Sequence, residues 1–378
     1  MTLAFLLFKY FPFGGAQRDC LKIASLCAAR GHEVSIFCRT WQGDLPAGIQ
    51  VQRLGEQGFT NVSKDRSFIS AARERLLADP PDGVIGFNRM PGLDVYFCAD
   101  SCWQAKIDES KRAWRRWLPR YRYLLEMEKA VFSRGQRTQI LMLTPREIPL
   151  YQKYYGTEAR FHVLPPGIAR HRFSESERVA QREQVRGEFG WPQDTKLILF
   201  VGSGFRTKGL DRAVRATASL PLPLRANVHF AVVGQDSKRP YENLAQRLGI
   251  GSHVHFLGGR PDVQRFYQAA DLLLHPAVKE NTGTVLLEAV AAGLPVLATA
   301  ACGYAPHVEK ARAGIILAEP FAQARLDEAL ASALQAPERS AWQANALAYA
   351  ASEDLYSQDE RAVEIIEQVI SSKISTRS

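Results

Sequence analysis

Short apolar runs alternate with segments of helical periodicity along most of the chain. Leu3–Phe8, Val95–Ala99, Lys196–Val201 and Val228–Val233 have the length and composition of buried strands, and each ends in a polar or glycine-containing stretch. From Gln323 the chain has helical composition almost to its end. Strands that alternate with helices form parallel sheets covered by helices, so the pattern predicts an α/β protein built from Rossmann-like units.

The segment 271–299 shows this alternation most clearly. A buried strand, Asp271–His275, is followed by a small, polar loop that ends in Gly283, and Thr284–Ala292 has the periodicity of a helix. In open α/β sheets, ligands bind at the carboxyl ends of the strands, facing the N-termini of the next helices. We therefore expect the backbone amides of Thr284 and Val285 to face an anion, most commonly a phosphate.

Two glutamates flank this expected phosphate site. Glu280 lies on the loop before the helix, and Glu288 falls on its second turn. Because an ionised carboxylate only accepts hydrogen bonds, next to a phosphate it is suited to sugar and ribose hydroxyls. This arrangement indicates a nucleotide sugar, and the alternative interpretation is an ordinary amphipathic helix with two solvated glutamates.

Glycine-containing loops follow other predicted strands. Arg206 and Lys208 stand among glycines after Lys196–Val201, and such a cationic loop before a helix suits a pyrophosphate. Gly14 and Gly15 follow the first strand, where they either allow the close approach of a ligand or form a plain tight turn. The chain contains neither a P-loop nor a GxGxxG sequence, which argues against a nicotinamide or flavin site.

The length of 378 residues predicts two domains, with the expected hinge at Pro165–Ile168. The 46% of hydrophobic and 23% of charged residues are typical of a soluble globular protein, and no apolar run is long enough to span a bilayer. The N-terminal MTLAFLLF is interpreted as a first strand rather than a signal peptide. The six cysteines lack CxxC or zinc-like spacing, which indicates buried thiols in a reducing cytoplasm.

Basic and aromatic residues are concentrated in the segment 103–134. Its nine Lys or Arg and four Asp or Glu give a net charge of +5, out of +9 for the whole chain. Tryptophans mixed with basic residues are typical of an element in the headgroup layer of a membrane, where each basic residue contributes about 1 kcal/mol. We expect membrane binding here, with nucleic-acid binding and a solvated surface helix as the alternatives. The candidate membrane contacts are Trp114, Arg115, Arg116, Trp117 and Arg120.

Several sequence strings carry a resemblance to a known family. The spacing of Glu280 and Glu288, with Gly283 between them, resembles the signature of the retaining glycosyltransferases of family four. The resemblance implies the GT-B fold, in which two Rossmann-like parallel-sheet domains face each other across a cleft. Longer strings are similar to the lipopolysaccharide core glycosyltransferases within that family: Lys9–Gly15, Met90–Phe97, Leu164–Ile168 and Ala300–Tyr304.

The resemblance also implies a domain organisation and a reaction. Residues 1–166 would form an acceptor- and membrane-facing domain, residues 167–350 a nucleotide-sugar-binding domain, and residues 351–378 a helix that returns to the first domain. The enzyme would move a hexose from a UDP-sugar to the inner-core heptose of lipopolysaccharide, on the cytoplasmic face of the inner membrane. Its partners would be the UDP-sugar, this acceptor and the anionic lipid surface, without nucleic acid, cofactor or metal, and the chain contains no Asp-x-Asp pair.

Roles for individual residues follow from the same resemblance. Glu280 would contact the donor sugar, Glu288 the ribose and Lys208 the diphosphate. Asp100 follows a predicted strand and is expected at the sheet edge, although a turn-forming Asp is the alternative. The candidate catalytic residues are Glu280, Lys208, Asp100 and Asp19. The candidate donor-binding residues are Gly14, Gly15, Tyr96, Arg172, Arg206, Thr207, Arg260, Asn281, Thr282, Gly283, Thr284, Val285 and Glu288.

Two loops depart from the glucosyltransferase member of the family. That member has Glu-Ala-Ala-Gly-Ile where this chain has Glu280–Thr284, and it has arginine in place of Thr207. The additional amide and hydroxyls, and the space left by the arginine, suit an acetamido group. We therefore expect UDP-GalNAc or UDP-GlcNAc as donor, with UDP-glucose as the alternative. A hypothesis of another class is a membrane- or RNA-associated binding protein that keeps the nucleotide-sugar fold without turnover.

Overall fold

The computed structural model describes residues 1–12, 14–55, 57–109, 113–156, 160–170 and 175–376. The chain divides into two compact units, residues 1–167 with 357–378, and residues 168–356. The sequence predicts boundaries after residues 166 and 350, and the observed division falls after residues 167 and 356. None of the described helices is both long enough and apolar enough to cross a membrane.

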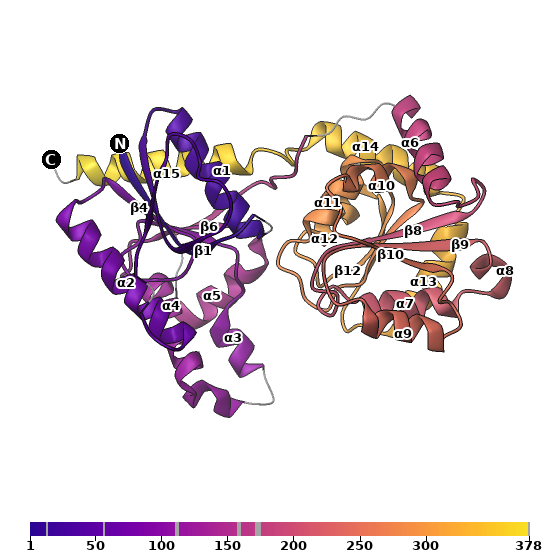
Figure 1. Cartoon of the computed structure of the whole chain (residues 1–378), viewed down its shortest axis with the longest axis horizontal. Coiled ribbons are helices and arrows are strands. Elements are labelled where there is room, and N and C mark those ends of the chain that lie inside the picture. Colours follow the sequence, from indigo (N-terminus) through magenta and orange to yellow (C-terminus); the bar gives the residue numbers. More distant parts are fainter. Residues whose placement is uncertain (13, 56, 110–112, 157–159, 171–174, 377–378) are drawn as a thin grey trace. The chain divides into compact units, whose positions relative to one another are not determined.

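The first unit is built on a parallel sheet of seven strands in the order β3-β2-β1-β4-β5-β6-β7 (Figure 1). The strand order reverses between β1 and β4, so the carboxyl ends of these two strands form the topological switch point of the sheet. The strands are β1 (Thr2–Tyr10), β2 (Glu33–Trp41), β3 (Gln50–Arg53), β4 (Gly83–Gly86), β5 (Val95–Cys98), β6 (Gln139–Met142) and β7 (Phe161–Val163). The helices are α1 (Gly15–Ala29), α2 (Asn61–Ala78), α3 (Trp103–Asp108), η1 (Ala113–Trp117), α4 (Pro119–Phe132), η2 (Pro145–Glu147), α5 (Ile148–Tyr155) and α15 (Gln358–Ser375).

The C-terminal helix α15 completes this first unit. Its side chains Val363 and Ile366 are buried in the same core as Leu3 of β1. A Cβ on Gly83 would lie 2.5 Å from Cδ1 of Ile370, so the glycine at the start of β4 lets the helix pack directly on the sheet. In Figure 1, α15 runs beside α1. The last helix of the chain therefore belongs to the N-terminal unit.

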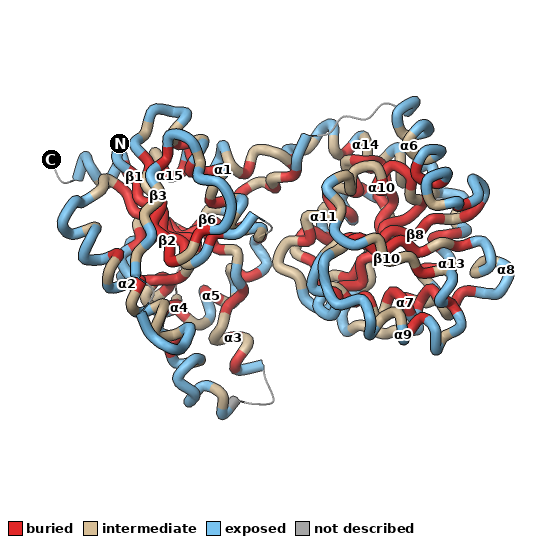
Figure 2. The backbone as a smooth tube through the Cα atoms, in the orientation of Figure 1, coloured by how far each residue is buried: buried red, intermediate tan, exposed pale blue. Residues whose placement is uncertain are grey.

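The second unit contains a parallel sheet of six strands in the order β10-β9-β8-β11-β12-β13. Its switch point lies between β8 and β11, and the strands of both sheets are mostly buried (Figure 2). The strands are β8 (Lys196–Val201), β9 (Val228–Val233), β10 (Val254–Gly258), β11 (Leu272–His275), β12 (Val296–Thr299) and β13 (Gly314–Leu317). The helices are α6 (Glu175–Glu188), α7 (Leu210–Ser219), α8 (Leu222–Arg225), α9 (Arg239–Arg247), α10 (Val263–Ala269), α11 (Thr284–Ala291), α12 (Ala305–Ala311), α13 (Gln323–Gln335) and α14 (Arg339–Ser352).

The two parallel sheets confirm the predicted α/β class with the GT-B arrangement of two Rossmann-like domains. Strands β8 and β9 have the predicted bounds. The prediction that the chain is helical almost to its end from Gln323 is confirmed, and this part consists of the separate helices α13, α14 and α15. Pro337 falls in the first break, where it lacks the N–H that a continuing helix would need.

Candidate active site

The loops at the switch point of the second sheet carry the principal candidate residues. Loop 202–209 follows β8, loop 276–283 follows β11, and these strands are neighbours. Thr207 joins the two loops, because its carbonyl oxygen accepts a hydrogen bond from the amide of Val278 at 2.8 Å. Lys208 and Glu280 therefore lie at the same edge of the sheet, although 72 positions separate them in the sequence.

Glu280 is held by two basic side chains. Lys208 donates from Nζ to Oε1 of Glu280, and Nε2 of the fully buried His275 lies 2.6 Å from Oε2. Burial alone would raise the pKa of Glu280, but the hydrogen bonds and charges of His275 and Lys208 outweigh burial and lower this pKa to about 2. The carboxylate is therefore ionised at physiological pH and can only accept hydrogen bonds.

Two glycines allow the loops to approach each other. Gly209 has a φ of 74°, and a Cβ there would lie 2.0 Å from the carbonyl oxygen of Pro276. Gly283 has a φ of 85° and directly precedes α11, so this helix follows a left-handed residue that any side chain would strain. The first amides of α11, including those of Thr284 and Val285, have no acceptor within the helix, which is the arrangement that suits an anion.

The loop between Glu280 and α11 lies close to the loop after β12. The amide of Glu280 donates to the carbonyl oxygen of Ala301 at 3.2 Å, and the amide of Tyr304 donates to that of Thr282 at 2.7 Å. These bonds fix the path of the backbone beside the first turn of α11. The half-buried residues along it are Asn281, Thr282, Thr284 and Val285.

Glu288 lies on the second turn of α11 and is also fixed by a neighbour. The hydroxyl of Tyr267 donates to Oε2 of Glu288 at 2.7 Å, and this tyrosine is buried on α10. The buried phenol sets the orientation of a half-buried carboxylate, which is the condition for recognising hydroxyl groups at a defined position.

The cationic candidates of this unit differ in their surroundings. Arg206 and Thr207 are exposed on loop 202–209. Arg260 follows β10, but its guanidinium forms ion pairs with Asp262 at 2.7 Å and with Glu188 at 3.7 Å. Arg206 is therefore accessible to a diphosphate, whereas Arg260 is already neutralised by carboxylates.

His275, Glu280 and Cys302 could together hold a metal ion. One ligand atom from each lies within 4.8 Å of the others, and this is the one such group in the part of the chain that the structure describes. An imidazole, a carboxylate and a thiolate would suit zinc. Lys208 already pairs with Glu280, however, and its charge opposes a second cation at the same carboxylate. We therefore assign Glu280 to hydrogen bonding.

The candidates after β1 lie at the switch point of the first sheet. Gly14 caps α1 and Gly15 begins it. Asp19 lies one turn further on α1 and is half-buried. Burial and the neighbouring carboxylate of Asp359 on α15 raise the pKa of Asp19 to about 6, although Lys22 and Arg18 lower it. Asp19 and Asp359 are thus two neighbouring carboxylates on α1 and α15 whose burial disfavours ionisation.

Asp100 and Tyr96 lie at β5 with opposite exposures. The carboxylate of Asp100 is exposed, while its carbonyl oxygen accepts hydrogen bonds from Tyr151 at 2.9 Å and from Arg89 at 3.3 Å. Tyr96 is fully buried in the core of the unit, so its side chain supports the sheet and offers no surface to a ligand in this structure. Arg172 lies outside the described residues.

The basic segment, residues 103–134, contains α3, η1 and α4. Trp114 exposes 60% and Trp117 77% of its surface. Tyr123 is buried in the core instead, so the exposed aromatic surface is narrower than the sequence pattern suggests. Arg115 is half-buried, and the exposed candidates are Trp114, Arg116, Trp117 and Arg120.

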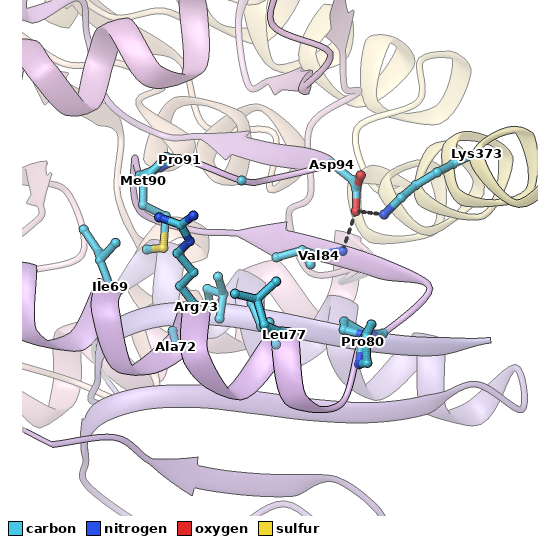
Figure 3. Close-up of a pocket in the computed structure, with 14 residues that line it drawn as sticks. Ile69, Ala72, Arg73, Leu77, Pro80, Val84, Met90, Pro91, Asp94 and Lys373 are labelled. Atoms are coloured by element: carbon cyan, nitrogen blue, oxygen red, sulfur yellow. Dashed lines mark hydrogen bonds and ion pairs between the residues drawn. The ribbon is translucent and has the colours of Figure 1, made fainter. Parts of the chain in front are cut away.

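A separate cavity of about 650 Å³ lies in the first unit beside α2 (Figure 3). Aliphatic and proline side chains form most of its lining, with Arg73 at one side. Lys373 donates to Asp94 at 2.6 Å, and Asp94 also accepts from the amide of Val84 at 2.9 Å. This ion pair fastens α15 to the sheet, and the apolar lining does not suit sugar transfer.

The sequence reasoning missed His275 and Tyr267 as partners of the two glutamates. A signal for His275 existed, because it is the polar end of an apolar strand directly before the loop. Tyr267 carried no such signal, since its contact with Glu288 joins two helices that are separate in sequence.

Comparisons with known proteins agree with this geometry. The family model described as Glycosyl transferases group 1 matches residues 181–349, and that described as Glycosyltransferase Family 4 matches residues 13–172. The chain is 47% identical over 368 residues to the lipopolysaccharide glucosyltransferase WaaG of Escherichia coli, covering 97% of this chain and 98% of that protein.

Solved structures show the same similarity. The crystal structure of WaaG, a glycosyltransferase involved in lipopolysaccharide biosynthesis, has a TM-score of 0.89 and 47% identity, and the match covers 96% of this chain and 99% of that chain. Anabaena HepE in complex with UDP-glucose, at 19% identity and with 100% of both chains covered, has a TM-score of 0.71, which shows a shared fold.

Proposed function

Because the chain belongs to glycosyltransferase family 4 and has the GT-B fold, we propose that it moves a hexose or N-acetylhexosamine from a UDP-sugar to the inner-core heptose of lipopolysaccharide, with retention of configuration. The observation that carries the donor half of this proposal is the contact between Lys208 and Glu280 at the switch point of the second sheet. The acceptor half is supported by the 47% identical relative, a lipopolysaccharide glucosyltransferase.

In this proposal the diphosphate lies against the first turn of α11 and Lys208. The leaving UDP gains negative charge in the transition state, and cations and amides that are already in place stabilise it most. Lys208, Arg206 and the amides of α11 supply this positive charge, so no metal is expected to be needed. Glu280 accepts hydrogen bonds from the donor sugar, and Glu288 accepts them from the ribose.

The acceptor would be reached at a membrane surface. Exposed Trp114 and Trp117, with Arg120 beside them, have the composition of an element that binds an anionic lipid layer. The protein would therefore act as a peripheral membrane enzyme. Flotation with vesicles tests the membrane binding. We expect binding to require anionic lipid and to fall as the salt concentration rises, because salt screens the charges. Equal binding to neutral vesicles would contradict it.

The reaction is tested by incubating the pure protein with a panel of UDP-sugars, with and without a heptose-terminated core acceptor. NMR would follow UDP release and the anomeric configuration of the product. Release of UDP that depends on the acceptor, with an unchanged anomeric configuration, is expected. A product of inverted configuration, or no acceptor-dependent release with any donor, would refute the proposal.

A further inference from the structure

A groove of about 750 Å³, lined by both polar and apolar side chains, lies in the first unit at the carboxyl ends of β1 and β2. Lys9 and Arg39 line it from these strands, and Asn61 and Arg120 line it from the first turns of α2 and α4. We propose that this groove binds an acidic sugar of the acceptor, one that carries a phosphate or a carboxylate. The inference rests on the proposed function and names the acceptor chemistry that this unit recognises.

Charge is the first argument for an anionic ligand. The charged residues that line the groove are Lys9, Arg39 and Arg120 against the carboxylate of Asp65, so the lining has a net charge of +2. Lys9 and Arg120 are exposed. Guanidinium and ammonium groups that converge on one groove bind phosphate or carboxylate through charge-assisted hydrogen bonds.

Arg39 gives the second and independent argument. It is only 6% exposed, and its Nη1 lies 2.7 Å from Oδ1 of Asp65. Among the residues that the structure describes, its Nε has no hydrogen-bond partner. Buried donors are nearly always paired, because an unpaired one loses its hydration without compensation. Arg39 also lines the groove, so its guanidinium places a positive charge there that Asp65 alone balances among the lining residues.

The neutral lining suits the hydroxyls of a sugar. Asn88 lies in the groove, and its Oδ1 accepts a hydrogen bond from the amide of Phe8 at 2.7 Å, which leaves its NH₂ group as a donor. Thr60, Asn61 and Gln17 add further hydroxyl and amide groups. A site for a bare phosphate would not require so many neutral donors and acceptors.

The groove is continuous with the exposed basic segment. Leu118 and Arg120 belong to both, and Trp117 directly precedes them. A phosphate could therefore come from the acceptor sugar or from the headgroup of a membrane phospholipid. The buried position of Arg39 favours the phosphate of the acceptor sugar. A phospholipid headgroup is tied to its acyl chains, so it would have to leave the lipid surface to reach Arg39.

The test uses Lys9→Gln and Arg120→Gln in the full chain, and leaves the buried Arg39 intact. Arg122→Gln is the matched control, because Arg122 is exposed on the same helix and is not part of the groove lining. Each groove variant is expected to raise KM for the acceptor about 10-fold, the size of one lost charge-assisted contact. Acceptor-independent hydrolysis of the UDP-sugar should stay unchanged in Lys9→Gln and in the control. Equal KM values for groove variants and control would overturn the proposal.

Direct binding separates this inference from the proposed function. NMR titration of the wild-type chain with sedoheptulose 7-phosphate, with sedoheptulose and with phosphatidylglycerol vesicles needs no turnover. We expect the sugar phosphate to bind at least 10-fold more tightly than the free sugar, and both groove variants to lose this difference. If binding holds but no transfer to a heptose occurs, the proposed function fails and the groove assignment stands. Equal binding of both sugars, or groove variants that impair vesicle binding alone, would overturn the sugar site.

Discussion

Nε2 of His275 lies 2.6 Å from Oε2 of Glu280, and the imidazole is fully buried at the end of β11. In the described part of the chain, Nδ1 of the same ring has no hydrogen-bond partner, so Glu280 is the polar anchor of this histidine. The carboxylate of Glu280 is held at one oxygen by the buried imidazole and at the other by Lys208, so it is oriented before a substrate arrives. His275 is therefore a positioning residue for Glu280.

Replacing this histidine should lower turnover without weakening the binding of UDP. In His275→Phe the ring is kept and the hydrogen bond is lost, so Glu280 can rotate away from the donor sugar. We expect kcat to fall by up to about 10²-fold, the effect of a small misplacement in a reacting site, with an unchanged Kd for UDP by calorimetry. His229→Phe is the control, because His229 lies near the amino end of β9 and pairs with His255. A normal kcat in His275→Phe would remove the positioning role.

Lys208→Ala tests the neutralisation of the leaving UDP. Removing one preorganised group that stabilises developing charge typically costs about 10²- to 10³-fold in kcat, and we expect a loss in this range. Folding should be retained, because Lys208 is half-buried on a loop. Lys238→Ala, at an exposed lysine that pairs with Glu242, serves as control. Wild-type rates in Lys208→Ala, measured as UDP release, would exclude Lys208 from the site.

The sheets could be predicted from the sequence because their central strands are apolar runs bounded by glycine and polar residues. β3 was not predicted, because Gln50–Arg53 is a short edge strand with polar residues at three of its four positions. α2 was also missed, because only Phe68 and Ala72 of its eighteen residues are buried, which leaves a weak periodic signal. Elements at the rim of a sheet therefore give less evidence in the sequence than those at its centre.

The proximity of Lys208 and Glu280 could be predicted for a related reason. Lys208 and Glu280 each follow a strand, and parallel neighbouring strands bring their carboxyl ends together. The burial of Tyr96 could not be foreseen from its place in a matching string, because the side to which a strand residue points depends on the register of the sheet. Side-chain partners such as Tyr267 likewise depend on how helices pack.

Glu288→Gln should weaken the binding of UDP itself. If Glu288 accepts charge-assisted hydrogen bonds from the ribose, the loss is roughly 1–3 kcal/mol. Tyr267→Phe should give a smaller loss, because it frees the carboxylate to rotate without removing its charge. Glu280→Gln is the internal control, since it should leave the binding of UDP unchanged and weaken only the binding of the intact UDP-sugar. Calorimetry that shows unchanged UDP affinity for Glu288→Gln would contradict the ribose assignment.

Asp19→Asn should stabilise the fold in a pH-dependent way. The folded-state pKa of about 6 lies above the ordinary 3.8, so ionising Asp19 costs more in the folded chain than in the unfolded chain. This destabilisation of the folded chain reaches its full size above pH 6, where Asp19 is ionised in both states. It disappears as the pH falls below 4, where Asp19 is protonated in both states. We expect the variant to gain roughly 1–3 kcal/mol in the free energy of unfolding at pH 7.5, and less toward pH 4.5. Urea denaturation measures this, with the exposed Asp44→Asn as control.

The same variant also bears on catalysis. A carboxylate kept at a cost to stability is typical of a functional position. If Asp19→Asn gains stability and loses transfer activity, the carboxylate serves the reaction. A gain in stability with full activity would leave Asp19 as a structural feature between α1 and α15.

The identity of the donor sugar rests on the loop beside Glu280. Asn281, Thr282 and Thr284 are half-buried there, and the exposed Thr207 lies on the neighbouring loop, whose backbone bonds to Val278. These side chains offer donors and acceptors that an acetamido group would use, and a buried polar group that its ligand leaves unpaired costs affinity. We therefore expect UDP release to be faster with UDP-GalNAc or UDP-GlcNAc than with UDP-glucose. The combined variant Thr207→Arg, Asn281→Ala and Thr284→Ile should shift the ratio of kcat/KM toward UDP-glucose by at least about 10-fold, while the Kd for UDP stays constant. A clear preference of the wild-type enzyme for UDP-glucose would show that these four polar residues do not select the donor.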